Sequence, residues 1–137
     1  MVTISILDYG VGNLRSISNA IKRNGGTPII THNIEEINNA DGLILPGVGA
    51  FKDALKNVAE YKSELMKIIE NGKPTLGICL GLQLLFTKSF EGGENQGLDI
   101  FKGVVVRLPS TVKIPHIGWN RIKIVNADNL LVKDLKS

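Results

Sequence analysis

Short apolar runs alternate with amphipathic segments along the N-terminal part of the chain. The runs cover residues 4–7, 27–31, 42–45 and 75–78 and are typical of buried strands. Apolar positions at helical spacing lie between them, first at Leu14, Ile17 and Ile21 and again over 51–70, and a short helix is predicted over 34–39. Because strands that alternate with helices favour parallel pairing, the pattern predicts an α/β fold, a mainly parallel sheet flanked by helices.

The segments after residue 81 are predicted to form one more helix, a loop and two strands. An apolar helix is predicted over 82–86, a polar glycine-rich loop over 89–97, and antiparallel strands over 103–108 and 121–125. No repeat or linker interrupts residues 1–137, so we expect a single domain. Ligands of such folds bind outside the carboxyl ends of the strands. The segments 8–13 and 46–51 and the turn at Cys79 are therefore expected to share one edge of the sheet.

The only cysteine, Cys79, lies between a predicted strand and the apolar helix, with Gly77 and Gly81 on its flanks. A strand, a tight turn of small residues and a helix, with the nucleophile at the apex, form a nucleophile elbow. The helix N-terminus favours negative charge on sulfur, and the backbone N–H of Leu80 can point at an oxyanion. A lone cysteine is more often a small core residue, but the flanking glycines favour a catalytic Cys79.

Two Gly-x-Gly loops, at residues 10–12 and 47–49, do not fit a nucleotide site. The third glycine of the dinucleotide fingerprint is missing in both, and no Gly-Lys-Ser/Thr follows. We interpret Gly47-Val48-Gly49 as a flexible loop whose backbone N–H groups face Cys79, since acyl transfer needs a second donor to the oxyanion. An ordinary strand-to-helix turn is the alternative. Asn13 is the predicted N-cap of the first helix.

Composition and charge narrow the class of protein. The 137 residues are 43% hydrophobic and 21% charged, without an apolar run long enough to span a membrane. A single cysteine excludes an intrachain disulfide and no signal peptide is indicated, so we expect a cytoplasmic protein. Residues 1–101 carry nine Lys and Arg against eleven Asp and Glu, a net −2, while residues 102–137 carry seven against two, a net +5. The basic residues are spaced singly, which favours a partner-facing or solvated surface over nucleic-acid binding.

Four more polar residues are candidates for a site. Gln83 follows Cys79 by one helical turn and Glu91 lies in the next loop. They either hold the polar ends of a substrate or are an ordinary helix glutamine and a solvated glutamate. His32 is expected to be solvated. His116 belongs to the segment 115–120, Pro-His-Ile-Gly-Trp-Asn, which is either a partner contact or the source of a base for Cys79.

These motifs together resemble those of the class I (triad) glutamine amidotransferases. Residues 77–86, Gly-Ile-Cys-Leu-Gly-Leu-Gln-Leu-Leu-Phe, are similar to the elbow of that family, and residues 46–51 to its oxyanion loop. The segments 8–14 and 115–120 narrow the resemblance to the glutaminase subunits of imidazole glycerol phosphate synthases.

The resemblance implies an enzyme that hydrolyses L-glutamine to glutamate and ammonia without a cofactor or a metal. Cys79 would attack the side-chain amide and form a thioester. The backbone N–H groups of Leu80 and of the Gly47–Val48 loop would stabilise the oxyanions. Gln83, Glu91 and Gly49 match positions that hold the glutamine.

The resemblance also implies a partner. A separate (β/α)8-barrel cyclase subunit would form a heterodimer with this chain and use its ammonia. The products would be imidazole glycerol phosphate, for histidine synthesis, and an aminoimidazole carboxamide ribonucleotide. Asn13, His116, Gly118 and Trp119 match segments that face the cyclase, so His116 would belong to the interface and not to the chemistry.

The chain departs from the family pattern in one respect. Family members are longer and carry a catalytic His and Glu in a Phe-His-Pro-Glu-like segment that residues 1–137 do not contain. We therefore expect an incomplete domain without its C-terminal strands, inactive alone. The alternatives are a catalytically silent module that docks on the cyclase, and the amidotransferase subunit of another synthase, for example one that acts in sugar amidination.

Overall fold

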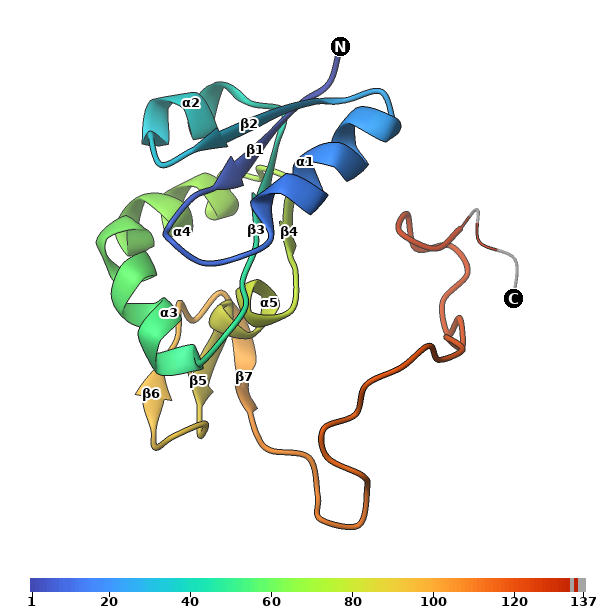
Figure 1. Ribbon diagram of the computed structural model, residues 1–137. Helices are drawn as coiled ribbons and strands as arrows, with labels where there is room; N and C mark the ends of the chain where they lie inside the picture. Colours follow the sequence, from blue (N-terminus) through green and yellow to red (C-terminus); the bar gives the residue numbers. More distant parts are fainter. Residues whose placement is uncertain (134, 136–137) are drawn as a thin grey trace. The chain divides into compact units, whose positions relative to one another are not determined.

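The computed structural model describes residues 1–133 and 135, which divide into two compact units (Figure 1). The first unit comprises Met1–Arg107 and the second begins at Leu108. Every helix and strand assigned to the described residues lies in the first unit, which therefore contains the candidate site around Cys79. The expected single domain over residues 1–137 stays a prediction.

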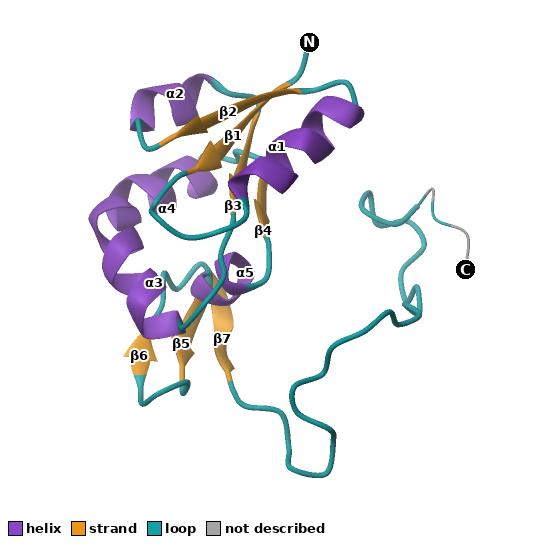
Figure 2. Cartoon of the chain, viewed as in Figure 1, coloured by secondary structure: helices purple, strands orange, loops and turns teal. Residues whose placement is uncertain are grey.

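Four parallel strands form the main sheet of the first unit (Figure 2). They are β1 (Thr3–Leu7), β2 (Thr27–Thr31), β3 (Gly42–Leu45) and β4 (Thr75–Gly77), in the order β2–β1–β3–β4. Helices connect them, as parallel neighbours require: α1 (Leu14–Arg23), α2 (Ile34–Asn39), α3 (Phe51–Val58) and α4 (Lys62–Glu70), with the 3-10 turn η1 (Ala59–Tyr61) joining the last two. The four predicted strands and the predicted fold class are confirmed.

Two asparagines and a lysine hold the ends of the helices. Asn13 is the N-cap of α1, where its Oδ1 accepts the N–H of Ser16 at 3.2 Å, as predicted. Asn33 caps α2 in the same way. The Nζ of Lys73 donates to the carbonyls of Asn38 and Ala40 at the end of α2. These bonds pair backbone groups that a helix end leaves free.

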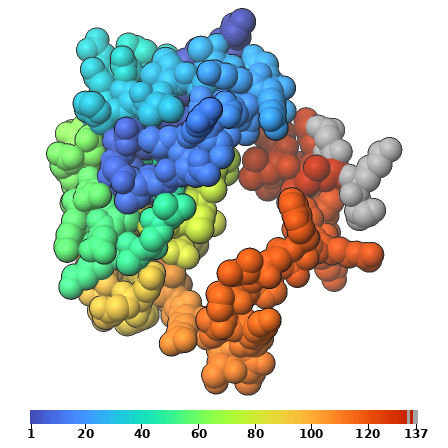
Figure 3. All heavy atoms as spheres, viewed as in Figure 1, coloured from blue at the N-terminus to red at the C-terminus, as the bar shows by residue number. Residues whose placement is uncertain are grey.

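The apolar core lies between one face of the main sheet and the helices that follow β2. Leu7, Leu43 and Leu45 supply the strand side chains of this core. The helical side is a set of fully or nearly fully buried side chains from four helices: Ile37, Phe51, Ala54, Val58, Leu65, Ile68, Leu80 and Leu84. The atoms of this unit run from blue to light orange in Figure 3, and those of residues 1–90 pack together on the face shown. This rigid base fixes the carboxyl ends of the strands.

A second, three-stranded sheet follows the helix α5 (Leu80–Leu84). Its order is β6–β5–β7, with β5 at Phe86–Ser89, β6 at Asn95–Gln96 and β7 at Phe101–Val105. Here the sequence predictions need correction. The helix ends at Leu84, so Phe86 begins a strand; the expected loop 89–97 contains β6; and β7 pairs with β5 in parallel and not antiparallel.

A long-range backbone contact lies where α5 ends. The N–H of Leu98 donates to the carbonyl of Leu84 at 2.8 Å, and the N–H groups of Ile100 and Phe101 donate to that of Leu85. The carbonyls at the end of α5 are thereby paired with the segment before β7, and the chain leaves the helix there. Apolar periodicity does not reveal such a partner.

The second unit carries no helix or strand in the residues described. Residues 121–125, predicted as a strand, are irregular, and most side chains from residue 108 onward are exposed. The strand prediction is wrong because none of the described segments pairs with these residues. No helix in the described part of the chain is long and apolar enough to cross a membrane.

Candidate functional site

Cys79 lies at the apex of the turn between β4 and α5, as the elbow predicted. Its backbone has φ 55° and ψ −118°, a conformation that residues other than glycine rarely adopt, and its side chain is exposed. The N–H of Ile78 donates to Leu45 of β3 at 3.0 Å, and the N–H of Gln83 donates to the carbonyl of Cys79 at 3.1 Å. The turn is thus fixed on both sides and presents the sulfur to solvent.

The two glycines beside Cys79 are required by close backbone contacts. A Cβ at Gly81 would lie 1.9 Å from the carbonyl oxygen of Leu45, and one at Gly77 would lie 2.6 Å from the Cα of Leu82. Both distances are far below any normal contact. The turn therefore requires small residues on both flanks, as the elbow pattern predicted.

Three loops meet at the carboxyl edge of the main sheet, as expected from the parallel order of β1, β3 and β4. A Cβ at Gly12 would lie 2.9 Å from the Cβ of Pro46, which joins the first loop to the second. A Cβ at Gly47 would lie 2.7 Å from the backbone nitrogen of Gly81 and 2.8 Å from the Cβ of Leu80. Gly47 therefore rests on the first turn of α5, directly after Cys79.

The outer part of the second loop is open to solvent. The Val48 side chain is 55% exposed, and Gly49 has φ +101° with nothing near the position of a Cβ. The direction in which the N–H groups of this loop point stays a prediction.

Tyr9 is a residue of this edge that sequence reasoning missed. It follows β1, its side chain is buried, and its hydroxyl donates a hydrogen bond to the carbonyl of Pro46. Burial raises the pKa of the Tyr9 phenol well above its ordinary value. A tyrosine at the carboxyl end of a buried strand was the available signal, because a buried phenol needs a partner.

Gln83 and Glu91 come together in the structure. Both line an open hollow of about 490 Å³, whose other walls include Phe90 and, at the end of β7, Val105 and Arg107. Cys79 is not among the residues that line it. Arg107 gives the hollow a cation opposite in charge to Glu91, and the sequence pattern had not singled it out.

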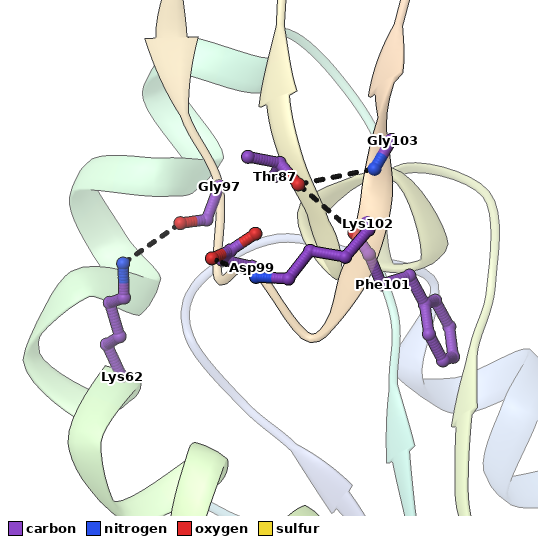
Figure 4. Close-up of polar contacts among 7 residues, drawn as sticks. All are labelled: Lys62, Thr87, Gly97, Asp99, Phe101, Lys102 and Gly103. Carbon is purple, nitrogen blue, oxygen red and sulfur yellow. Dashed lines mark hydrogen bonds and ion pairs between the residues drawn. The ribbon is translucent and has the colours of Figure 1, made fainter.

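A group of polar contacts holds the strands that form this hollow (Figure 4). The Thr87 hydroxyl accepts the N–H of Gly103 at 3.2 Å, and Lys62 Nζ donates to the carbonyl of Gly97 at 3.0 Å. Lys102 pairs with Asp99 at 2.7 Å and, as the largest cause, holds the pKa of that carboxyl below its usual range. The Thr87–Gly103 bond ties β5 to β7, and the Lys62–Gly97 bond joins α4 to the segment after β6.

The remaining predicted residues are distributed over both units. Asn13 is exposed in the first unit, and His32 is exposed after β2, which is the edge strand opposite β4. His116, Gly118 and Trp119 lie in the second unit, where the Trp119 side chain is fully exposed. Asn120 Nδ2 lies 3.0 Å from His116 Nε2. Within the described residues, no group of three or more His, Cys, Asp or Glu side chains could hold a metal ion.

The chain is similar to a known protein family and to several known proteins that share one name. Residues 5–135 match the family described as glutamine amidotransferase class-I. The chain is 54% identical over 136 residues to the imidazole glycerol phosphate synthase subunit HisH of Caldanaerobacter subterraneus subsp. tengcongensis, covering 98% of this chain and 66% of the relative. It is 55% identical over 120 residues to the subunit of the same name from Aquifex aeolicus, covering 85% of this chain and 58% of the relative. For that of Methanosarcina barkeri the identity is 53% over 125 residues, covering 90% and 62%. The chain thus spans roughly three-fifths to two-thirds of the length of these relatives.

Proposed function

The chain belongs to the class-I glutamine amidotransferases, and we propose that it acts as the glutaminase subunit of an imidazole glycerol phosphate synthase. The observation that carries the proposal is the exposed Cys79 at the apex of a strained strand-to-helix turn. Relatives that share about half of the residues bear the name of this subunit. Geometry and similarity therefore support the same chemistry.

The reaction is an acyl transfer to sulfur. Cys79 Sγ attacks the side-chain amide carbon of L-glutamine, a C–S bond forms, and the C–N bond breaks as ammonia leaves with a proton from a general acid. Water then attacks the thioester, which releases glutamate and restores the thiol. We propose that a histidine of the family's Phe-His-Pro-Glu-like segment, outside residues 1–137, handles the protons.

Two backbone donors stabilise the oxyanion in this proposal. Leu80 is the first residue of α5, and the N–H groups of a first helical turn have no partner within the helix. The second donor is the N–H of Val48, next to Gly47 and Gly49 of the loop. The contact of Gly47 with the start of α5 supports this assignment, because it brings the loop beside the nucleophile.

We propose that the hollow lined by Gln83 and Glu91 binds the part of the glutamine molecule away from its side-chain amide. A carboxylate at Glu91 suits the α-ammonium group of glutamine, and the amide of Gln83 suits a polar end of the same molecule. Support comes from the arrangement itself, since two residues eight positions apart in sequence line one hollow.

We further propose a heterodimer with a (β/α)8-barrel cyclase, located in the cytoplasm, where a free thiol persists. In it the ammonia enters a lyase step that yields imidazole glycerol phosphate and an aminoimidazole carboxamide ribonucleotide. Asn13, His116, Gly118 and Trp119 are assigned to the interface. A fully exposed tryptophan supports this, because tryptophan is enriched where protein surfaces bind each other.

The test is glutamine hydrolysis by the full-length protein together with the cyclase. We expect Cys79→Ala to lower kcat by at least about 10⁴-fold, since the nucleophile is removed. Ser63→Ala, which removes an exposed hydroxyl on α4, is the control and is expected to retain the parent rate. Hydrolysis that survives Cys79→Ala contradicts the proposal. Tight binding to the cyclase without glutamine hydrolysis would support a catalytically silent docking module instead. A rate of hydrolysis that does not change when the cyclase is added would support the amidotransferase subunit of another synthase.

A further inference from the structure

Tyr9 is buried beside the site, yet the reaction described above does not use it. Its side chain is 5% exposed, and its hydroxyl hydrogen bonds to the carbonyl oxygen of Pro46. The same hydroxyl would lie 2.9 Å from a Cβ at Gly47. The phenol therefore rests against the Pro46–Gly47 peptide, at the start of the loop whose Gly47 contacts the first turn of α5.

The carbonyl that Tyr9 binds is held from a second side. A Cβ at Gly81 would lie 2.7 Å from the Pro46 oxygen, so this oxygen is packed against the first turn of α5. A peptide unit is planar and trans, which makes its C=O and its N–H point in opposite directions. Fixing the carbonyl of Pro46 therefore also fixes the N–H of Gly47 and the point from which the Gly47–Val48 peptide leaves.

We propose that the Tyr9 hydroxyl is a positioning group that holds the Pro46–Gly47 peptide, so that the next peptide presents its N–H to the oxyanion formed at Cys79. This inference rests on the proposed function and adds a residue to it. Reversing the Pro46–Gly47 peptide would leave a buried phenol without an acceptor, which opposes the reversal. The raised pKa of the phenol keeps its proton in place in the pH range of enzyme assays.

Ser5, on the strand β1 that precedes Tyr9, offers a matched control. Its side chain is fully buried, and its hydroxyl donates to the carbonyl of Gly42 at 2.9 Å. Tyr9 and Ser5 thus each connect the β1 segment to the β3 segment by one hydroxyl-to-carbonyl bond. The Tyr9 bond lies at the carboxyl end of β3, beside Cys79, and the Ser5 bond lies at the start of β3.

The experiment compares Tyr9→Phe with Ser5→Ala in the full-length protein bound to the cyclase. We expect Tyr9→Phe to lower kcat for glutamine by about 10- to 100-fold with KM changed by less than about 3-fold, because a transition-state donor is misplaced while substrate contacts remain. Amide exchange at Gly47 and Val48 should become faster in Tyr9→Phe. Ser5→Ala should leave both kcat and this exchange at the parent values.

Two outcomes overturn the inference while leaving the proposed function intact. One is Cys79-dependent hydrolysis in which Tyr9→Phe keeps the parent kcat. Another is an equal fall in Tyr9→Phe and Ser5→Ala, which would indicate a general loss of packing. If the parent shows no Cys79-dependent hydrolysis, the proposed function fails, and unchanged exchange at Gly47 and Val48 would then overturn the positioning role as well.

A second variant keeps the inference testable if Tyr9→Phe folds poorly. Tyr9→4-aminophenylalanine retains a hydrogen-bond donor on the ring, and we expect it to keep more than half of the parent kcat. If Tyr9→Phe folds, an equal loss of kcat in the 4-aminophenylalanine variant would count against the inference. If Tyr9→Phe does not fold, a fall of the 4-aminophenylalanine variant to about a tenth of the parent kcat would count against it.

Discussion

At the scale of single residues, the site depends on a strained cysteine. The backbone of Cys79 has φ 55°, and residues held in such conformations cost about 1–3 kcal/mol each. The surrounding contacts impose it: Ile78 is hydrogen bonded to Leu45, and the backbones at Gly77 and Gly81 lie too close to their neighbours for the turn to relax. The conformation that these contacts impose holds the sulfur clear of the backbone and exposed.

Replacement of Cys79 by glycine tests this strain. We expect Cys79→Gly to be more stable than Cys79→Ala by about 1 kcal/mol. Glycine adopts positive φ without strain, and we expect this gain in the folded state to exceed the cost of the larger conformational entropy of glycine in the unfolded state. Urea unfolding of the two variants gives the difference. Ala20→Gly, at an exposed position of α1, is the control and should lose about 1 kcal/mol. If glycine also destabilises position 79, the turn is not strained.

At the scale of elements, local signals set where most helices and strands begin, and long-range bonds set where some of them end. Asn13 and Asn33 each cap a helix through a hydrogen bond to a backbone N–H no more than three residues away. The cap at Asn13 was predicted from the sequence. The end of α5 depends instead on donors from residues 98–101. The cap at Asn13 also belongs to the proposed interface, so the two roles need to be separated.

Substitutions at Asn13 separate the cap from the interface. We expect Asn13→Ala to lose about 1 kcal/mol of stability and Asn13→Asp to change it by no more than a few tenths, because aspartate caps a helix as well as asparagine does. Both variants should bind the cyclase more weakly than the parent. Asn33→Ala is the control, with a similar loss of stability and the parent affinity. Asn13→Asp with unchanged affinity, measured by titration calorimetry, would remove Asn13 from the interface.

At the scale of the whole molecule, the buried Tyr9 links the catalytic edge to global stability. Burial raises the pKa of its phenol in the folded protein above the ordinary value near 10 that applies to the unfolded chain. Folding then favours the protonated form. The contribution of Tyr9 to stability is therefore fully present below about pH 10 and declines as the pH rises toward the folded pKa.

The difference between the parent and Tyr9→Phe in free energy of unfolding shows this dependence. We expect it to be constant from pH 7 to 9 and to shrink above about pH 10, by up to about 1.4 kcal/mol per pH unit. Urea unfolding at several pH values measures it, and the lysines that titrate in the same range cancel in the difference. A difference that stays level to pH 11 would show that the phenol is not buried in the native protein.

Much of the fold and part of the site could be predicted from local patterns. The four parallel strands, the cap at Asn13 and the elbow around Cys79 all follow from apolar spacing, capping residues and glycines within a few positions of one another. The meeting of three loops at one edge followed from parallel connectivity, which places carboxyl ends together. Residues such as Tyr9 and Arg107 were missed because their partners are distant in sequence.

The sequence by itself determined the alternation of strands and helices and the turn that exposes Cys79, because these depend on side-chain periodicity and on backbone freedom at particular glycines. Only the tertiary structure decided the end of α5, the parallel pairing of β5 with β7, the bond between Tyr9 and Pro46, and the hollow shared by Gln83 and Glu91. Each of these joins backbone or side-chain groups whose pairing is chosen by packing of the whole unit, and no local pattern of residues encodes that choice.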